Sequence, residues 1–242
     1  MKSDQSIPAF PHEHIQACTV CAQQPDAMFP HFSVREMAAL QTFARHVVLP
    51  ANTVLFTEGS VPDAVYILCS GHVKATVSYN TNKCLLVRVA RPGDVLGLSA
   101  VLLHAVHEVS AQAMETVHLQ SFSRHDFLRF IQRYINGTMH TALSINTEYR
   151  SALQDACRLA LSRTVTERVV RLLLDLSTAF IENEQGEITI SIAFTHEELA
   201  SMSGTTRETI TRVLSAMKKR HILAVNGGMI SIHHSRMRSL LA

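Results

Sequence analysis

Two helix starts follow one another closely near the carboxyl end of the sequence. Thr195-x-x-Glu198 and Thr205-x-x-Glu208 both have the form of a capping box, in which a hydroxyl and a carboxylate satisfy free backbone amides at the start of a helix. Between them, Ala200 is small and Gly204 permits a tight turn, which allows two short helices to pack nearly perpendicular to each other. This spacing predicts a helix-turn-helix.

The second of these helices separates its apolar and polar residues. Ile210, Val213 and Leu214 fall on the face expected to pack on the core, and the polar residues near the helix start fall on the other face. At that position in a recognition helix, Arg can bind guanine O6 and N7, and Glu can accept from cytosine N4. Residues 203–220 contain five basic residues and one acidic residue, although the net charge of the whole chain is only +2. The residues predicted to contact DNA are Thr205, Thr206, Arg207, Glu208, Thr211, Arg212 and Lys218.

A short hairpin is predicted directly after the second helix. The runs Ile222 to Val225 and Met229 to Ile232 flank Asn226-Gly227-Gly228, a strong signal for a tight turn between two strands. Another helix is predicted for 164–180, followed by a polar linker at 182–187. Residues 164–242 are therefore expected to form a winged helix-turn-helix domain that binds double-stranded DNA. The competing interpretation is a solvated helix with ordinary Arg/Glu pairs.

The sequence between residues 47 and 121 has a different pattern of residue types. Short runs rich in β-branched residues alternate with turn signals, at intervals near the roughly 8–12 residues that are typical of a compact all-β sandwich or barrel. A short helix with a Ser33-x-x-Glu36 capping box precedes these runs. We expect an antiparallel β-roll sensor domain at residues 31–136, after an irregular arm at residues 1–30.

Helical signals return at His125 and, apart from Gly137, continue to about Leu161. Within them, residues at steps of three or four form a narrow stripe, which suits a partner helix better than a broad core. The stripe predicted to form a homodimer interface consists of Met139, Leu143, Asn146, Tyr149, Leu153 and Ala156. The alternative is that it packs on the β-roll of its own chain. Residues 137–163 are assigned to a dimerisation helix and hinge.

Composition argues against several other classes of protein. The longest apolar runs fall well short of the roughly 18 residues that cross a bilayer, so neither a transmembrane helix nor a membrane partner is expected. The N-terminus lacks the features of a secretory signal, which predicts a cytoplasmic protein. Five cysteines argue against a disulfide-rich secreted scaffold, and Cys69, Cys84 and Cys157 are expected to be small buried residues.

Four motifs connect these parts to a known family: Phe56-Thr-Glu-Gly59, Tyr66-Ile-Leu-Cys-Ser-Gly71, Pro92-Gly-Asp-Val-Leu-Gly97 and Gly204-Thr-Thr-Arg-Glu-Thr-Ile-Thr-Arg212. Over nearly its whole length the chain resembles the cyclic-AMP receptor protein/FNR family of bacterial transcription regulators. The resemblance implies an α+β fold with a cyclic-nucleotide-binding-like β-roll, a homodimer, palindromic operators, RNA polymerase as a partner and no enzymatic activity. Because Arg207 resembles the cyclic-AMP receptor branch, we expect half-sites closer to TGTGA than to TTGAT, about one helical turn apart.

The effector is not defined by the sequence. Family members that bind cyclic nucleotides carry a Glu after the last Gly corner and an Arg farther on, where this chain has Leu98 and Val109. The long helix has Leu153 and Gln154 where small hydroxyl residues usually meet the adenine. Because a buried cyclic phosphate would lack its guanidinium partner, cyclic AMP is disfavoured.

An iron-sulfur cluster or haem also lacks a full set of ligands. Cys18 and Cys21 have the spacing of FNR-type sensors, but Ala27 and a position near Gln120 replace the other two thiolates, and His14 could substitute for only one of them. The Cys-x-x-Cys pair alone fits a degenerate arm, a dithiol switch or a site shared across a dimer. We favour the vestigial interpretation over the redox one, since no charge or helix N-terminus beside the pair lowers the pKa of the thiols. The close histidine pairs that suggest haem are interpreted as surface or core histidines: His12 and His14, His104 and His107, His233 and His234. A redox- or gas-responsive regulator is the alternative.

Two other classes of protein compete with a DNA-binding regulator. An isolated nucleotide-binding module does not account for the second half of the chain. A metal-dependent enzyme built on His12-x-His14 or on the paired cysteines would need a clustered acid/base constellation, which the sequence lacks.

Overall fold

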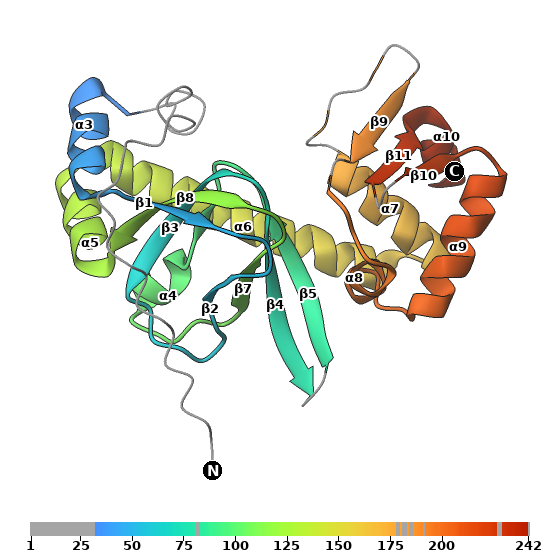
Figure 1. Ribbon diagram of the computed structural model, residues 1–242, viewed down its shortest axis with the longest axis horizontal. Helices are drawn as coiled ribbons and strands as arrows, with labels where there is room; N and C mark the ends of the chain where they lie inside the picture. Colours follow the sequence, from blue (N-terminus) through green and yellow to red (C-terminus); the bar gives the residue numbers. More distant parts are fainter. Residues whose placement is uncertain are drawn as a thin grey trace.

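The computed structural model describes residues 32–241 except for 81–82, 178–179, 181–182, 184–185, 191 and 227–228. The predicted arm at residues 1–30, with His14, Cys18 and Cys21, lies outside the described residues. A β-rich part and a C-terminal, mainly helical part lie toward the two ends of one long helix (Figure 1).

The described strands of the β-rich part form two four-stranded antiparallel sheets, in the orders β1-β8-β3-β6 and β2-β7-β4-β5. The strands are β1 Arg45–Leu49, β2 Val54–Phe56, β3 Ala64–Ser70, β4 Val73–Asn80, β5 Lys83–Ala90, β6 Val95–Leu96, β7 Ser110–Ala113 and β8 Val117–Ser123. The predicted antiparallel β-roll is confirmed.

Strand β3 is buried on both faces, which explains its continuous apolar run. Its residues alternate between two clusters: Tyr66 and Leu68 pack in the core between the sheets, and Val65 and Ile67 pack in a second core beneath helices. That second core is covered by α3 (Val34–Phe43) and α5 (Arg124–Arg133), with α4 (Leu98–Leu103) beside it. Both halves of the predicted Ser33/Glu36 capping box are formed at α3.

The long helix α6 spans Ile135–Leu161, a length of 27 residues. The prediction of helical structure from His125 onward missed a break at Tyr134, whose extended backbone (φ −120°, ψ 115°) separates α5 from α6. Gly137 does not interrupt α6. A Cβ at this position would lie 2.6 Å from Cε1 of Phe130 on α5. The glycine therefore allows α5 to pack closely against the start of α6.

The C-terminal part contains a three-stranded sheet in the order β10-β11-β9, together with its helices. Its elements are α7 Val165–Ser177, β9 Glu187–Ile190, α8 His196–Met202, α9 Arg207–Lys219, β10 Leu223–Asn226, β11 Met229–His233, α10 His234–Arg238 and a 3₁₀ turn at Ser239–Leu241. The predicted hairpin is present, with Asn226 paired to Met229. Strand β9, which the sequence interpretation did not assign, completes the sheet by placing Ile188 and Ile190 opposite β11.

The two parts share apolar core. Leu86 and Val89 of β5 belong to the same buried cluster as the core of the C-terminal part. Polar contacts reinforce this junction: the backbone N–H of Leu86 donates to Oγ of Ser201 at 2.7 Å, and Lys74 Nζ lies 2.9 Å from Oε1 of Glu198. Helix α8 is thereby fixed against the β4–β5 hairpin. No described helix is both long enough and apolar enough to cross a membrane.

Candidate nucleic-acid interface and sensor domain

The turn between α8 and α9 has the geometry that its sequence predicts. Thr195 and Glu198 form the capping box at the start of α8. Ala200 is buried, and its carbonyl accepts a hydrogen bond from the backbone N–H of Thr205 at 3.0 Å. Gly204 has φ +57°, in the left-handed region that favours glycine. A larger residue at either position would disturb the packing of the two helices.

Helix α9 begins one residue later than the second capping box predicts. Its N-cap is Thr206, whose hydroxyl accepts from the backbone N–H of Thr209 at 3.3 Å, whereas Thr205 is half-buried in the turn. The Thr205/Glu208 box is therefore wrong. Helix α9 still forms close to its predicted start, because Thr206 is as good an N-cap residue as Thr205.

The apolar side of α9 is buried as predicted, through Ile210, Val213 and Leu214. The opposite side is exposed, and it includes six of the seven predicted DNA contacts, Thr205 being half-buried: Thr206, Arg207, Glu208, Thr211, Arg212 and Lys218. Hydrogen bonds from its own backbone N–H and from the Thr206 hydroxyl lower the pKa of Glu208. The start of α9 thus presents an ionised carboxylate together with the exposed side chains of Arg207 and Arg212.

The stripe predicted on α6 is exposed along its whole length. Met139, Leu143, Tyr149 and Leu153 have exposed fractions between 44% and 65%, and Asn146 and Ala156 are exposed too. The residues of α6 that are buried in the described chain, Gly137, Thr141 and Arg158, lie on another side of the helix. The alternative that the stripe packs on its own β-roll is therefore wrong, and the stripe is free to contact a second copy.

The interior of the β-roll contains a buried histidine. The ring of His107 stacks on Phe56 with a centroid distance of 3.9 Å and is 4% exposed. A Cβ at Gly97 would come within 3.2 Å of His107 Cε1, so the ring fills the space beside the last glycine corner. Burial lowers the pKa of His107, with the charge of Asp63 acting in the opposite direction. Burial therefore favours the neutral form of this imidazole, which packs against Phe56.

A cavity of about 220 Å³ lies between the β5–β6 corner and α6. Arg88 lies beside it, with guanidinium nitrogens 2.8 Å from Asp94 Oδ2 and 3.1 Å from Glu148 Oε1. Burial raises the pKa of Glu148, and the charge of Arg88 opposes that effect. Because Leu143 of the dimer stripe also lines this cavity, its opening lies close to the predicted subunit contact.

The free thiols of the described chain, Cys84 and Cys157, lie on different elements, and the rings of His46 and His118 stack at a centroid distance of 5.4 Å. Cys69 is buried as expected, and it is not a free thiol. Cys84 and Cys157 are exposed, contrary to expectation, because their positions on β5 and α6 face away from the buried clusters. His104 contacts the guanidinium of Arg124, away from His107. Within the described ranges, no group of three His, Cys, Asp or Glu side chains could hold a metal ion.

Two arginines that the sequence interpretation did not select contact the turn of the helix-turn-helix. Arg158 of α6 reaches the carbonyl of Met202, and Arg168 of α7 donates to the carbonyl of Ser203 at 2.9 Å. Local patterns could not identify them, since each lies more than thirty residues from the carbonyl it contacts.

A β-roll, a long helix with an exposed apolar stripe and a winged helix-turn-helix together define a class of DNA-binding regulators with a sensor domain. Two family models agree with this assignment: the cyclic nucleotide-binding domain matches residues 46–134, and the Crp-like helix-turn-helix domain matches residues 167–238. The chain belongs to the CRP/FNR family of transcription regulators. It is a homodimeric, DNA-binding transcription regulator whose sensor domain is coupled to DNA binding.

Several curated proteins are similar to this chain over most of its length. The cyclic AMP receptor protein of Thermus thermophilus is 25% identical over 204 residues, covering 84% of this chain and 90% of that protein. The transcriptional activator protein Anr of Pseudomonas protegens is 26% identical over 231 residues, covering 94% and 93%. Among solved structures, FixK2 from Bradyrhizobium japonicum has a TM-score of 0.70 at 20% identity, covering 81% of this chain and 96% of that chain, which supports the fold.

Proposed function

We propose that Arg207, Glu208 and Arg212 read base edges in the major groove of a palindromic operator. The observation that carries this proposal is the exposed row of charged side chains at the start of α9, on a helix whose other side is buried. The remaining predicted contacts, Thr205, Thr206, Thr211 and Lys218, hold the helix in register through phosphates. Arg207 and Arg212 supply the bidentate donors that suit guanine.

The operator follows from these residues and from the two-fold symmetry of the dimer. Selection of bound duplexes from a randomised pool, at a fixed salt concentration, is expected to yield palindromes with half-sites about one helical turn apart. The half-sites are expected to be closer to TGTGA than to TTGAT, because Arg207 suits a guanine. Enrichment of TTGAT half-sites would contradict the assignment of Arg207, and recovery of unrelated sequences would contradict base reading altogether.

The same selection, repeated with cyclic AMP, tests the effector. Cyclic AMP is not expected to change the affinity for the recovered operator, because Leu98 and Val109 replace the two polar partners of the ligand and His107 occupies space beside Gly97. No cofactor is proposed, because the sequence supplies a full ligand set for neither an iron-sulfur cluster nor haem. We assign the protein to the bacterial cytoplasm, where its DNA lies, and give it no enzymatic activity, since its relatives are regulators.

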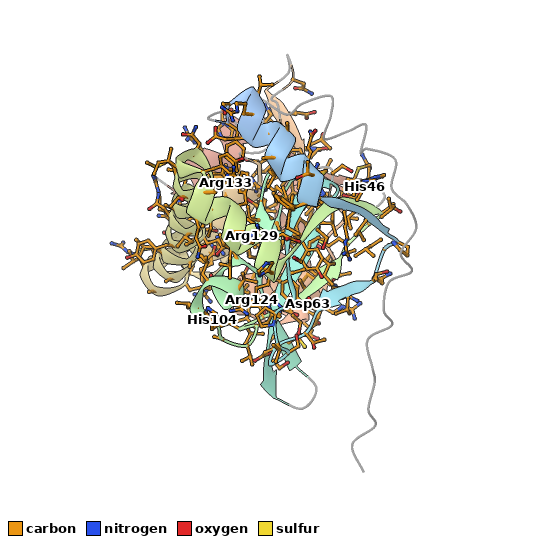
Figure 2. The ribbon with its side chains drawn as sticks, turned by 90° about the vertical axis from the view of Figure 1, so that its left-hand side faces the viewer. His46, Asp63, His104, Arg124, Arg129 and Arg133 are labelled. Carbon is orange, nitrogen blue, oxygen red and sulfur yellow. The ribbon has the colours of Figure 1, made fainter. Side chains whose placement is uncertain are left out.

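A contact with RNA polymerase is supported by a second surface. Arg124, Arg129 and Arg133 of α5 lie on the end face of the sensor domain (Figure 2). Arg129 and Arg133 are exposed and one helical turn apart, and within the described part of the chain neither forms an ion pair. Arg133 also lies over the ring of Tyr134, 5.7 Å from its centroid. Exposed guanidinium groups that form no ion pair within the described chain fit an acidic surface.

Changing both Arg129 and Arg133 to Glu is expected to weaken binding of RNA polymerase to the protein–operator complex about 10-fold, because like charges then meet at the contact. Purified polymerase titrated onto the labelled complex measures this effect. Affinity for the operator alone should stay within about twofold, since α5 lies far from α9 along the molecule (Figure 1). Arg171→Glu, in an exposed pair with Glu167, is the control. Unchanged recruitment by the double variant would exclude this face as the contact.

A further inference from the structure

The guanidinium of Arg158 is the most buried charged group at the junction between the long helix and the DNA-binding domain. Arg158 is 6% exposed, although it lies on a helix that is otherwise largely open to solvent. Its terminal nitrogens lie 2.7 Å from Oδ1 of Asp155 and 2.9 Å from Oδ2 of Asp175. Two carboxylates from two helices thus compensate one buried cation.

The same guanidinium also reaches the turn of the helix-turn-helix. Its Nη2 donates to the carbonyl of Met202, the last residue of α8, at 3.5 Å. From the other side, Nε of Arg168 on α7 donates to the next carbonyl, that of Ser203, at 2.9 Å. Carbonyls at the end of a helix lack intrahelical partners and attract cations. Two arginines from two different helices therefore satisfy two successive carbonyls of one turn.

Apolar packing adds a second contact between α6 and this turn. A Cβ at Gly204 would lie 3.4 Å from Cδ2 of Leu159, the residue after Arg158. Ser203, the residue before Gly204, is fully buried, at 0% exposure. The turn that precedes the recognition helix thus rests directly on the C-terminal end of the dimerisation helix.

A buried ion pair contributes little net stability, because desolvation offsets its Coulomb energy, and an apolar side chain of similar size would often stabilise the fold as well. The planar guanidinium group of an arginine, however, holds each of its hydrogen bonds in a fixed direction. Here the hydrogen bonds of the Arg158 guanidinium link α6 to α7 and to the end of α8. In the dimer, α6 pairs with its counterpart, so a turn fixed to α6 is fixed relative to the two-fold axis.

We propose that Arg158 is a positioning residue for DNA recognition: it ties the turn of the helix-turn-helix to the dimerisation helix and so sets the separation and relative rotation of the two recognition helices. The residue touches no DNA itself. The inference rests on the operator recognition proposed above. Arg158 determines which spacing between half-sites the dimer binds, and α9 determines which base sequence each half-site has. Each added base pair moves a half-site by about 3.4 Å and turns it by about 34°, so spacing is a sensitive readout.

The experiment compares Arg158→Met with the unmodified dimer on three duplexes made from the selected operator: the natural spacing, one base pair more and one base pair fewer. Methionine keeps a long side chain and removes the planar guanidinium group. We expect affinity for the natural spacing to fall about 10-fold and affinity for the other two duplexes to change less than about twofold, so that discrimination between spacings is lost. Arg158→Lys is expected to behave like Arg158→Met, since it retains the charge and lacks the planar guanidinium group.

Two further variants keep the result interpretable. Arg171→Met removes an exposed arginine of α7 that pairs with Glu167 and does not contact the turn, and it should leave discrimination unchanged. Asp175→Asn weakens one ion pair of Arg158 at a half-exposed position. This variant should fold even if Arg158→Met does not. It should lose part of the discrimination between operator spacings.

The outcomes separate this inference from the function on which it rests. Equal loss of affinity on all three duplexes, with the ratio between spacings preserved, would overturn the positioning role and leave Arg158 a structural residue. If the unmodified dimer did not distinguish the three duplexes, the palindromic operator itself would be contradicted, whatever Arg158→Met did.

Discussion

Alanine at both Arg207 and Arg212 is expected to lower the affinity of the dimer for its selected operator by about 100-fold or more, because each bidentate contact with a guanine contributes about 1–3 kcal/mol. Both side chains are exposed and lie outside the core, so the variant should stay folded and dimeric. Titration of a labelled operator duplex, in one buffer at one salt concentration, measures the loss.

Non-specific binding provides the internal comparison for this variant. Affinity for a duplex of unrelated sequence should fall far less, since phosphate contacts from the remaining lysines persist. Arg129→Ala combined with Arg133→Ala removes the same number of arginines from α5 and should leave operator affinity unchanged. If the Arg207/Arg212 variant kept its preference for the operator, base reading by α9 would be refuted.

Placing Glu at both Leu143 and Leu153 is expected to convert the dimer into a monomer. These side chains are 44% and 50% exposed in the single chain, and a glutamate at each would put two like charges opposite their counterparts in a close helix pair. Analytical ultracentrifugation measures the change in mass. Because a monomer binds only one half-site at a time, affinity for the palindrome should fall about 100-fold or more.

Gln132→Glu, on the exposed surface of α5, adds a charge outside α6 and should remain dimeric. Near-wild-type circular dichroism of the Leu143/Leu153 variant would show that the monomer is folded. A variant that sedimented as a dimer would place the subunit contact elsewhere than on the stripe.

Local sequence signals predicted most of the elements that have local causes. Capping boxes located the starts of α3 and α8, the Asn-Gly-Gly turn located the hairpin, and the step of three or four residues located the exposed side of α6. Each depends on residues within about one or two turns of one another, which is the range over which a capping or turn preference acts.

The features that the sequence did not predict depend on contacts between residues far apart in the sequence, or on neighbouring residues that suit the same structural role almost equally well. Strand β9 has only four residues, of which two isoleucines are buried, so its identity as a strand comes from its pairing with β11, about forty residues later. The choice of Thr206 over Thr205 as N-cap is one between two equally good residues. The break at Tyr134 follows from α5 packing against Gly137, and the exposure of Cys84 and Cys157 follows from which side of each element faces a core.

Leu86 and Val89 belong to the sensor domain by their place in the chain and to the DNA-binding domain by their place in the core. A substitution there alters two domains at once, and a compensating change can arise in either of them. The DNA-binding domain therefore cannot diverge independently of the β4–β5 hairpin, and a chimaera that joins this helix-turn-helix to another β-roll would have to carry the hairpin face with it.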